Sequence, residues 1–457
     1  MNVREAIWTQ PMRGFQISVV IMCLVVCIID GFEILVMAFI APTLSKAWSL
    51  TQVQTGYLLS AGIFGMAAGS MLISPLADKI GRRRHTIICL ALIVIGMSLS
   101  AMAQNLSWLL AARAFAGLFL GGIVASLNVL VAEYSSDRRR GTVMGIYGIG
   151  FPLGAALGGL ISVALIGAYG WRGPLWFGAS LTAVMFVVCL AMLPESVNYL
   201  IEKRPAGALD AYNKIGAKLG LAPASEMPPQ SPYHARTTVG RGMFQGIMLK
   251  RTIFLWCGYA MLVSAFYFAN SWTPKLISDA TGQPMLGVRA GALVAAGGVL
   301  GALLFALLSV RVHPRLGTVF VMWGGTIAFI LFANVFRSGP VTALSVAVLV
   351  GVFANGGIAA FYAISPPIYP TAIRGSAVGF MMAFGRGFSI LAPIITGYIL
   401  ASGVTPPTTY MGFGVILIVA GFSILALHRS YRGANALDAM QEEWRAASEA
   451  KENTAAA

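Results

Sequence analysis

Residues Phe15 to Phe39 read FQISVVIMCLVVCIIDGFEILVMAF, an apolar run whose only charged side chains are Asp30 and Glu33. A helix of this length crosses a membrane hydrocarbon layer, which is about 30 Å thick. The three-residue spacing places both carboxyl groups on one face of that helix. Because a charge at such depth costs about 2.5–3.5 kcal/mol on insertion scales, intramembrane acids usually serve proton or ion pathways. We therefore predict that the two acids carry protons; the alternative is that Asp30 only hydrogen-bonds a neighbouring helix.

The composition of the whole chain also indicates a membrane protein. Hydrophobic residues make up 58% of 457 positions and charged residues 10%, against about 45–50% and about 25% in soluble domains. Backbone polar groups in lipid must be satisfied within each span, so the prediction is an all-α membrane protein. Twelve apolar runs of spanning length predict twelve transmembrane helices: 15–42, 52–77, 85–103, 107–133, 141–168, 172–193, 252–279, 287–310, 316–336, 340–369, 375–402 and 407–428.

The net charge of +15 is distributed as in a membrane protein. Of the 31 Lys and Arg residues, 24 fall on one side of the predicted membrane, five on the other, and Arg113 and Arg386 within spans. An excess of basic residues marks cytoplasmic loops. We therefore predict a multi-pass protein of the inner, cytoplasmic membrane with both termini in the cytoplasm, in contact with lipid and not with nucleic acid. The first apolar run is longer than the core of a signal peptide and is expected to stay as a span.

A polar segment divides the spans into two groups of six. The prediction is an N-terminal six-helix bundle over 1–193, a cytoplasmic linker over 194–250, a C-terminal six-helix bundle over 251–429 and a cytoplasmic tail over 430–457. Short helices are expected near 206–219 in the linker and over 436–451 in the tail. The halves echo each other at Arg140-Gly141 and Arg374-Gly375, and at Lys79-Ile80-Gly81 and Arg315-Leu316-Gly317. Corresponding positions of this kind indicate a parallel repeat.

Two arginines lie inside spans. Arg386 is roughly 18 Å into its helix, near the midplane where carrier sites lie, and its planar guanidinium matches a carboxylate. We predict that Arg386 binds an anionic substrate; the alternative is a salt bridge to Asp30 or Glu33. For Arg113, a part in the proton network and a packing role both stay open.

Aromatic side chains in the C-terminal half are candidates for stacking on a substrate ring. Aromatic residues also face lipid or the membrane interface, so each is a candidate only. They are Tyr267, Phe268, Trp272, Phe361 and Tyr362.

Charged residues at the cytoplasmic ends of the early spans suggest a gate. Asp78, Arg82, Glu133 and Arg140 are predicted to form charge pairs that exist only while the cytoplasmic side is closed, because only a differential interaction shifts a conformational equilibrium. The alternative is that these charges are solvated and only determine topology. Pro314 stands at the place in the second half that corresponds to Asp78, so an asymmetric gate is expected.

Other classes of function have little support in the sequence. The five cysteines lie in apolar spans without metal-ligand spacing, so we predict no metal and no cofactor apart from the coupling protons. The four histidines are scattered, and no nucleophile and base come together, so we predict no enzyme. A membrane sensor, the remaining alternative, would need a larger signalling segment than 194–250 or 430–457.

Several motifs resemble those of the major facilitator superfamily. The resemblance covers Arg113 with Gly117 and Gly121, and the glycines around Pro152. It is most extensive in the loop Ser74-Pro75-Leu76-Ala77-Asp78-Lys79-Ile80-Gly81-Arg82-Arg83-Arg84, which is similar to the superfamily's cytoplasmic loop signature with Ser74 in place of its first glycine. This resemblance implies the twelve-helix major facilitator fold and transport by alternating access.

A narrower resemblance is to the aromatic acid/proton symporters of that superfamily. Asp30-Gly31-Phe32-Glu33 is similar to their first-helix Asp-Gly-x-Asp motif, with Glu33 in place of the second aspartate. The run from Tyr267 through Asn270 and Trp272 to Pro274 partly matches their seventh-helix pattern, and from this match we predict that Asn270 contacts substrate. The tenth-helix stretch 356–362 lacks the glutamine expected there.

The resemblance implies a function. The chain is expected to import a small aromatic carboxylate, such as a benzoate or hydroxybenzoate, together with protons, and to work as a monomer. The alternatives are a proton-coupled carrier of another organic anion and an exporter driven by proton antiport.

Overall fold

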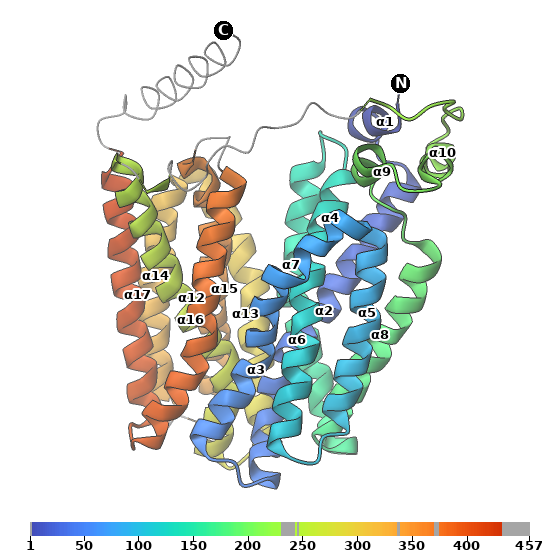
Figure 1. Ribbon diagram of the computed structural model, residues 1–457. Coiled ribbons are helices and arrows are strands. Elements are labelled where there is room, and N and C mark those ends of the chain that lie inside the picture. The colour runs from blue at the N-terminus through green and yellow to red at the C-terminus, as the bar shows by residue number, and fades with distance from the viewer. Residues whose placement is uncertain (1, 230–242, 245, 336–338, 370–373, 432–457) are drawn as a thin grey trace.

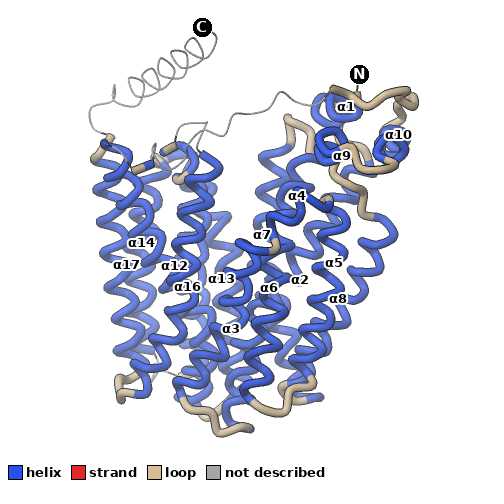
Figure 2. The backbone as a smooth tube through the Cα atoms, viewed as in Figure 1, coloured by secondary structure: helices blue, strands red, loops and turns tan. Residues whose placement is uncertain are grey.

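The computed structural model describes all residues except 1, 230–242, 245, 336–338, 370–373 and 432–457. Within the described residues every regular element is helical, and no strand occurs (Figure 2). Twelve helices are long and apolar enough to cross a membrane. The predicted class, an all-α membrane protein with twelve spans, is therefore confirmed.

The spans have the following bounds. The first six are α2 (Gly14–Ala47), α3 (Gln52–Leu72), α5 (Arg82–Ala101), α6 (Leu106–Glu133), α7 (Arg140–Tyr169) and α8 (Arg172–Met192). The last six are α12 (Gly246–Thr281), α13 (Pro284–Arg311), α14 (Pro314–Val335), α15 (Pro340–Ile364), α16 (Arg374–Ala401) and α17 (Pro406–Arg429). Proline begins α13, α14, α15 and α17, where its missing N–H has no helical partner to lose.

Short helices accompany the spans. They are α1 (Val3–Thr9), α4 (Ala77–Ile80), α9 (Val197–Lys203), α10 (Ala208–Lys218) and the 3₁₀ turns η1 (Ser74–Leu76) and η2 (Pro366–Ile368). α10 confirms the helix predicted in the linker. α1 was not predicted; a capping box between Asn2 and Glu5 begins it, and the Val3 amide donates to the Tyr212 hydroxyl of α10 at 2.9 Å. The helix predicted over 436–451 lies outside the described residues.

The two groups of six helices pack by the same pattern. In the N-terminal bundle α3 packs on α6, α5 on α8 and α2 on α7. The corresponding pairs of the C-terminal bundle are α13 with α15, α14 with α17 and α12 with α16. The two bundles also contact each other: α3 packs on α16, and α7 packs on α13. This arrangement is the pseudo-twofold relation that a parallel repeat predicts.

The bundles meet in one half of the molecule. We call the end with α1 and the last residues of α17 the terminal face, and the opposite end the far face (Figure 1). Toward the far face, Ser60 donates to the Ile390 carbonyl at 2.8 Å, and the hydroxyls of Tyr57 and Tyr398 lie 3.0 Å apart. A Cβ atom on Gly56 would lie 2.7 Å from the Pro393 carbonyl oxygen. The bundles therefore approach each other closely near the far face.

Toward the terminal face the bundles diverge (Figure 1). Gly145 and Gly148 lie in the half of α7 nearest that face, and no atom lies within 4 Å of a Cβ built on either glycine. The same holds for Gly379 in α16. Backbone that is open in this way beside a closed far half is consistent with a carrier that faces its terminal side.

Candidate functional site

The site begins with a close contact between α2 and α7. A Cβ atom on Gly31 would overlap the Phe151 carbonyl oxygen, and one on Gly154 would overlap the Ile28 carbonyl oxygen. Glycine at both positions lets the two backbones touch, as small residues do between membrane helices. This contact explains why a glycine follows Asp30 in the sequence.

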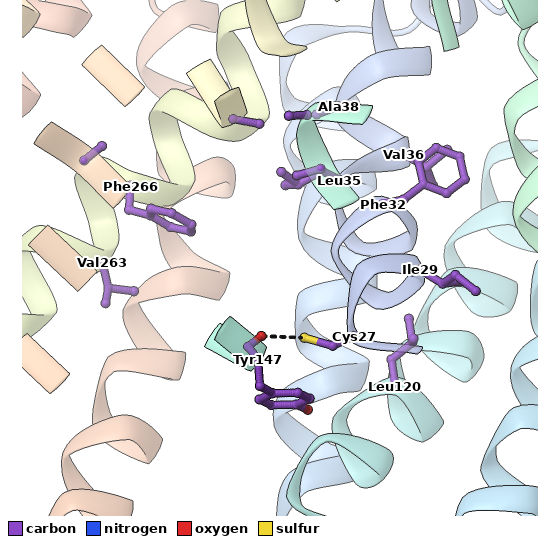
Figure 3. Packing of buried hydrophobic residues seen from close by; sticks show 14 of the residues in the cluster. Cys27, Ile29, Phe32, Leu35, Val36, Ala38, Leu120, Tyr147, Val263 and Phe266 are labelled. Atoms are coloured by element: carbon purple, nitrogen blue, oxygen red, sulfur yellow. Dashed lines mark hydrogen bonds between the residues drawn. The ribbon is translucent and has the colours of Figure 1, made fainter. Parts of the chain in front are cut away.

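Asp30 lies on α2 beside this contact. Its side chain is 5% exposed, and its Oδ1 atom has no hydrogen-bond partner among the described residues. Glu33 and Arg386 lie within its electrostatic range. One turn away, the Cys27 thiol donates to the Tyr147 carbonyl at 3.8 Å, and Figure 3 shows this bond across from Val263 of α12. A buried carboxyl oxygen without a partner is costly, which marks Asp30 as a group that takes up a partner or a proton.

Glu33 points into the N-terminal bundle. Its Oε1 atom accepts a hydrogen bond of 2.6 Å from the Thr182 hydroxyl of α8. The fully buried Arg113 of α6 donates to the Glu33 backbone carbonyl at 2.7 Å and contacts the Met97 sulfur at 2.8 Å. No ion pair joins Arg113 to the Glu33 carboxylate among the described residues.

The two acids therefore have different surroundings. They share a face of α2, as predicted, but Glu33 is bound inside one bundle while Asp30 is near Arg386 of the other bundle. Thr182 was not identified from the sequence, because a lone threonine in an apolar span carries no periodic signal.

Arg386 lies half-buried on α16 where the bundles meet. Its Nη1 atom donates to the Met66 carbonyl of α3 at 3.1 Å. The alternative of a salt bridge to Asp30 or Glu33 is absent from this conformation, since no ion pair among the described residues includes Arg386. The guanidinium therefore retains donors for another acceptor.

Tyrosines of the C-terminal bundle surround Arg386. Tyr267 of α12 is within electrostatic range of Arg386, Asp30 and Tyr362. Tyr259 of α12 was not identified from the sequence; its ring centroid lies 6.5 Å from that of Tyr362, and it is within electrostatic range of Arg386. A Cβ on Gly385 would overlap the Tyr259 ring, so the glycine beside Arg386 makes room for it.

Other predicted substrate contacts are engaged elsewhere in this conformation. The fully buried Trp272 donates to the Pro393 carbonyl at 3.1 Å, and Asn270 donates to the Phe266 carbonyl of its own helix at 2.9 Å. Phe361 is fully buried against Tyr259, with ring centroids 5.5 Å apart. Phe268 stacks on Phe413 at 4.1 Å in the core of the C-terminal bundle. These four side chains support the fold around the site and offer no free surface to a ligand.

Three of the four predicted gate residues do come together. Arg82 pairs with Asp78 at 3.0 Å and with Glu133 at 3.5 Å, and it donates to the Ser196 hydroxyl at 2.9 Å. Ser196 in turn donates to Glu133 at 2.5 Å. Sequence reasoning missed Ser196 and the neighbouring Glu195, which accepts from the Arg83 amide at 3.0 Å. The sequence signal that could have identified them is Glu195, an acid that directly follows the sixth span and lies next to a basic loop.

The predicted dependence of this cluster on closure of the cytoplasmic side stays a prediction. All its members belong to the N-terminal half, and they are paired while the bundles meet only toward the far face. Arg140 is not a member: it pairs with Asp137 at 2.8 Å and donates to the Ala132 carbonyl at 3.2 Å. The cluster therefore ties α4, α5, α6 and α9 together within one bundle.

A search of the described residues for metal ligands finds no place where three His, Cys, Asp or Glu side chains could hold a metal ion. The ionisable groups of the site are the carboxyl groups of Asp30 and Glu33, the guanidinium of Arg386 and the phenols of Tyr259 and Tyr267.

Comparison with known proteins is consistent with this arrangement. The family model described as Major Facilitator Superfamily matches residues 22–341. The 4-hydroxybenzoate transporter PcaK of Pseudomonas aeruginosa is 31% identical over 409 residues, covering 88% of this chain and 90% of its own length. A gallate transporter of Pseudomonas putida is 27% identical over 428 residues, covering 93% of this chain and 95% of its own length.

A solved structure shares the fold. The xylose transporter XylE from E. coli, in a partially occluded inward-open conformation, superposes with a TM-score of 0.70 at 14% sequence identity. The match covers 91% of this chain and 98% of the other. Together with the twelve spans in two repeated bundles, these matches show that the chain belongs to the major facilitator superfamily.

Proposed function

We propose that this chain is a proton-coupled carrier that imports a small aromatic carboxylate by alternating access. The observation that supports it most directly is the partnerless oxygen of Asp30 within electrostatic range of Arg386 and Tyr267, where the two bundles meet. Relatives named for 4-hydroxybenzoate and gallate transport supply the substrate class.

Arg386 is proposed to bind the substrate carboxylate. A guanidinium remains charged and offers a planar fork of donors that matches a carboxylate. Tyr267 is within electrostatic range of Arg386, and Tyr362 is near Tyr267; their rings are proposed to make offset or edge contacts with the substrate ring, worth about 0.5–1.5 kcal/mol. The hydroxyls of these tyrosines are suited to ring substituents that donate or accept hydrogen bonds.

Asp30 is proposed to carry the coupling proton, which binds when the substrate binds and leaves when it leaves. When a carboxylate occupies Arg386, a second negative charge at Asp30 is unfavourable, so Asp30 is loaded with a proton. When the substrate leaves, Arg386 stabilises ionised Asp30, and the proton is released. The protonation state of Asp30 thus depends on whether substrate is bound at Arg386. This dependence is the differential interaction that couples the proton to the substrate. Glu33 and Arg113 are proposed to hold the geometry of α2 beside Asp30.

Import follows from coupling to a proton gradient directed inward, and the orientation of the chain is proposed from its charges. The excess of basic residues assigns the terminal face to the cytoplasm, so the contacts near the far face close the outside in this conformation. We assign the chain to the inner membrane, as a monomer that uses no cofactor other than protons and catalyses no reaction.

Uptake into proteoliposomes tests the proposal. Labelled benzoates, phenylacetates and aliphatic acids are offered with and without an inward proton gradient, to the wild type, Asp30→Asn and the control Asp210→Asn. Asp210 is exposed on α10 and outside the site. We expect gradient-driven accumulation of an aromatic acid that is lost in Asp30→Asn while exchange persists. Accumulation of aliphatic acids alone, or accumulation driven by an outward gradient, would identify another anion carrier or an antiporter instead.

A further inference from the structure

Two arginines share one tyrosine ring at the terminal face of the C-terminal bundle. The Arg251 guanidinium lies 3.7 Å from the centroid of the Tyr431 ring, and the Arg315 guanidinium lies 3.4 Å from it. Arg251 is near the start of α12, Arg315 is at the start of α14, and Tyr431 follows the end of α17. The cluster therefore sits where three membrane spans end together.

Among the described residues no carboxylate forms an ion pair with this cluster. Arg251 is fully buried, and it donates to the Ser430 hydroxyl at 3.3 Å and carbonyl at 3.1 Å. Its Nη1 atom is buried without a hydrogen-bond partner among the described residues. Contact with an aromatic face is worth about 0.5–2 kcal/mol but supplies no counter-charge. A buried guanidinium left in this way is costly, so an anion at this place would be stabilising.

The bundle itself cannot supply that anion. Between residues 251 and 431 the only Asp or Glu is Asp279, which pairs with Lys275 near the far-face end of α12. The cluster and this acid are therefore at opposite ends of the same helix.

The matching cluster of the N-terminal half does contain acids. There Arg82 pairs with Asp78 and Glu133. The repeat aligns Lys79-Ile80-Gly81 with Arg315-Leu316-Gly317, which places Pro314 where the first half has Asp78. In this alignment Arg315 stands where the first half has Lys79, and the second half lacks the carboxylate of Asp78.

Two imidazoles lie together at this face. The rings of His313 and His428 lie 5.3 Å apart, edge to face. Burial, and then the nearby charge of Arg315, lower the pKa of His313.

We propose that the half-buried Arg315 binds the phosphate of an anionic phospholipid head group, and that the buried charge of Arg251 strengthens this binding. Guanidinium groups match phosphate geometry, and basic pockets between the cytoplasmic ends of membrane helices are suited to lipid head groups. Because Arg315 is half-buried at the start of α14, it is the member of the cluster that a head group in the surrounding bilayer would contact. This site is separate from the proposed transport site and does not depend on its substrate.

Thermal unfolding of the full chain in detergent tests the site. The midpoint is measured with no addition, with a short-chain phosphatidylglycerol, with the matching phosphatidylcholine, and with inorganic phosphate. We expect phosphatidylglycerol to raise the midpoint by several degrees and the other two additions to raise it by less than half as much. An equal rise with inorganic phosphate would overturn the lipid as the source, and no rise with any addition would overturn the site.

Variants connect the effect to the cluster. Arg315 is only half-buried, so Arg315→Gln is expected to fold and to lose most of the rise, whereas Arg289→Gln, an exposed arginine near the far face, keeps it. Pro314→Asp restores the acid of the first half and is expected to raise the midpoint without lipid. An undiminished phosphatidylglycerol effect in Arg315→Gln would overturn the proposal. So would stabilisation that needs no lipid and disappears when Asp438, Glu442 and Glu443 are replaced, because the chain's own tail would then supply the anion.

Discussion

The Thr182 hydroxyl donates a 2.6 Å hydrogen bond to the Glu33 carboxyl, whereas the Oδ1 atom of Asp30, three residues earlier, has no partner in the described structure. A motif that looks like a matched pair of acids therefore contains two unequal groups. One is held inside the N-terminal bundle, and the other faces the arginine of the opposite bundle. Their replacements should accordingly have different effects.

Asp30→Asn and Glu33→Gln should reduce transport to different extents. Asp30→Asn removes the proposed proton carrier, so we expect gradient-driven accumulation to fall to the background while exchange of substrate across the membrane persists. Glu33→Gln keeps an acceptor for Thr182, so accumulation should fall no more than about tenfold, equivalent to about 1.4 kcal/mol. Flux in proteoliposomes measures both. Equal loss in the two variants would show that the acids act as one unit.

Removing the Thr182 hydroxyl should destabilise the N-terminal bundle. Thr182→Val keeps the shape of the side chain but leaves the buried Glu33 carboxyl without its donor, at a cost of about 1–3 kcal/mol. We expect a lower unfolding midpoint in detergent, and Thr182→Ser, which retains the hydroxyl, should restore most of it. A midpoint equally low in the serine variant would attribute the effect to packing of the threonine methyl group.

The charge cluster around Arg82 should depend on one acid much more than on the other. Asp78 is 72% exposed in its side chain, so its ion pair is worth less than about 1 kcal/mol. Glu133 is 10% exposed and also accepts from Ser196, so Glu133→Gln should cost more, about 1–3 kcal/mol. Unfolding midpoints of Asp78→Asn and Glu133→Gln make the comparison. Similar losses in both would contradict this ranking.

The spans were predictable because each is an apolar run, and the same physical requirement that hides the backbone from lipid makes the run a helix. The close contact of α2 with α7 also has a local sign in the sequence, which is the glycine, Gly31, that follows Asp30. Arg386 was identified by its type and depth, and Tyr267 by its aromatic ring and its place in the seventh-helix pattern of the resembled family.

The remaining site contacts depend on pairs that are distant in sequence. Tyr259 reaches Arg386 only because α12 packs on α16, and Trp272 is buried by the same packing. Arg140 was assigned to the wrong cluster because its nearest acid, Asp137, lies three residues away on the local turn and pairs with it first. No pattern of residue types distinguishes these outcomes before the helices are assembled.

Arg386→Lys should separate charge from geometry at the proposed substrate site. Lysine keeps the positive charge but loses the planar fork, so we expect the apparent KM for an aromatic carboxylate to rise about tenfold or more. Concentration-dependent uptake measures this change, and Arg289→Lys, on an exposed arginine away from the site, is the control. An unchanged KM in Arg386→Lys would exclude carboxylate binding by this side chain.

A larger side chain at Gly56 should prevent the bundles from meeting near the far face. Gly56 of α3 has its would-be Cβ 2.7 Å from the Pro393 carbonyl, and Gly397 of α16 is equally close to the Gln52 carbonyl. Gly56→Leu therefore cannot adopt the present contact without separating α3 from α16, and the carrier should shift to a conformation open at the far face.

Cysteines placed at Tyr57 and Tyr398, whose hydroxyls now lie 3.0 Å apart, report this shift. We expect them to cross-link readily in the otherwise unchanged chain and at least tenfold more slowly with Gly56→Leu. The matched control is Gly412→Leu, since nothing lies within 4 Å of a Cβ at Gly412. Fast cross-linking with Gly56→Leu would mean that the helices tolerate the side chain and that the far-face contact does not depend on this glycine.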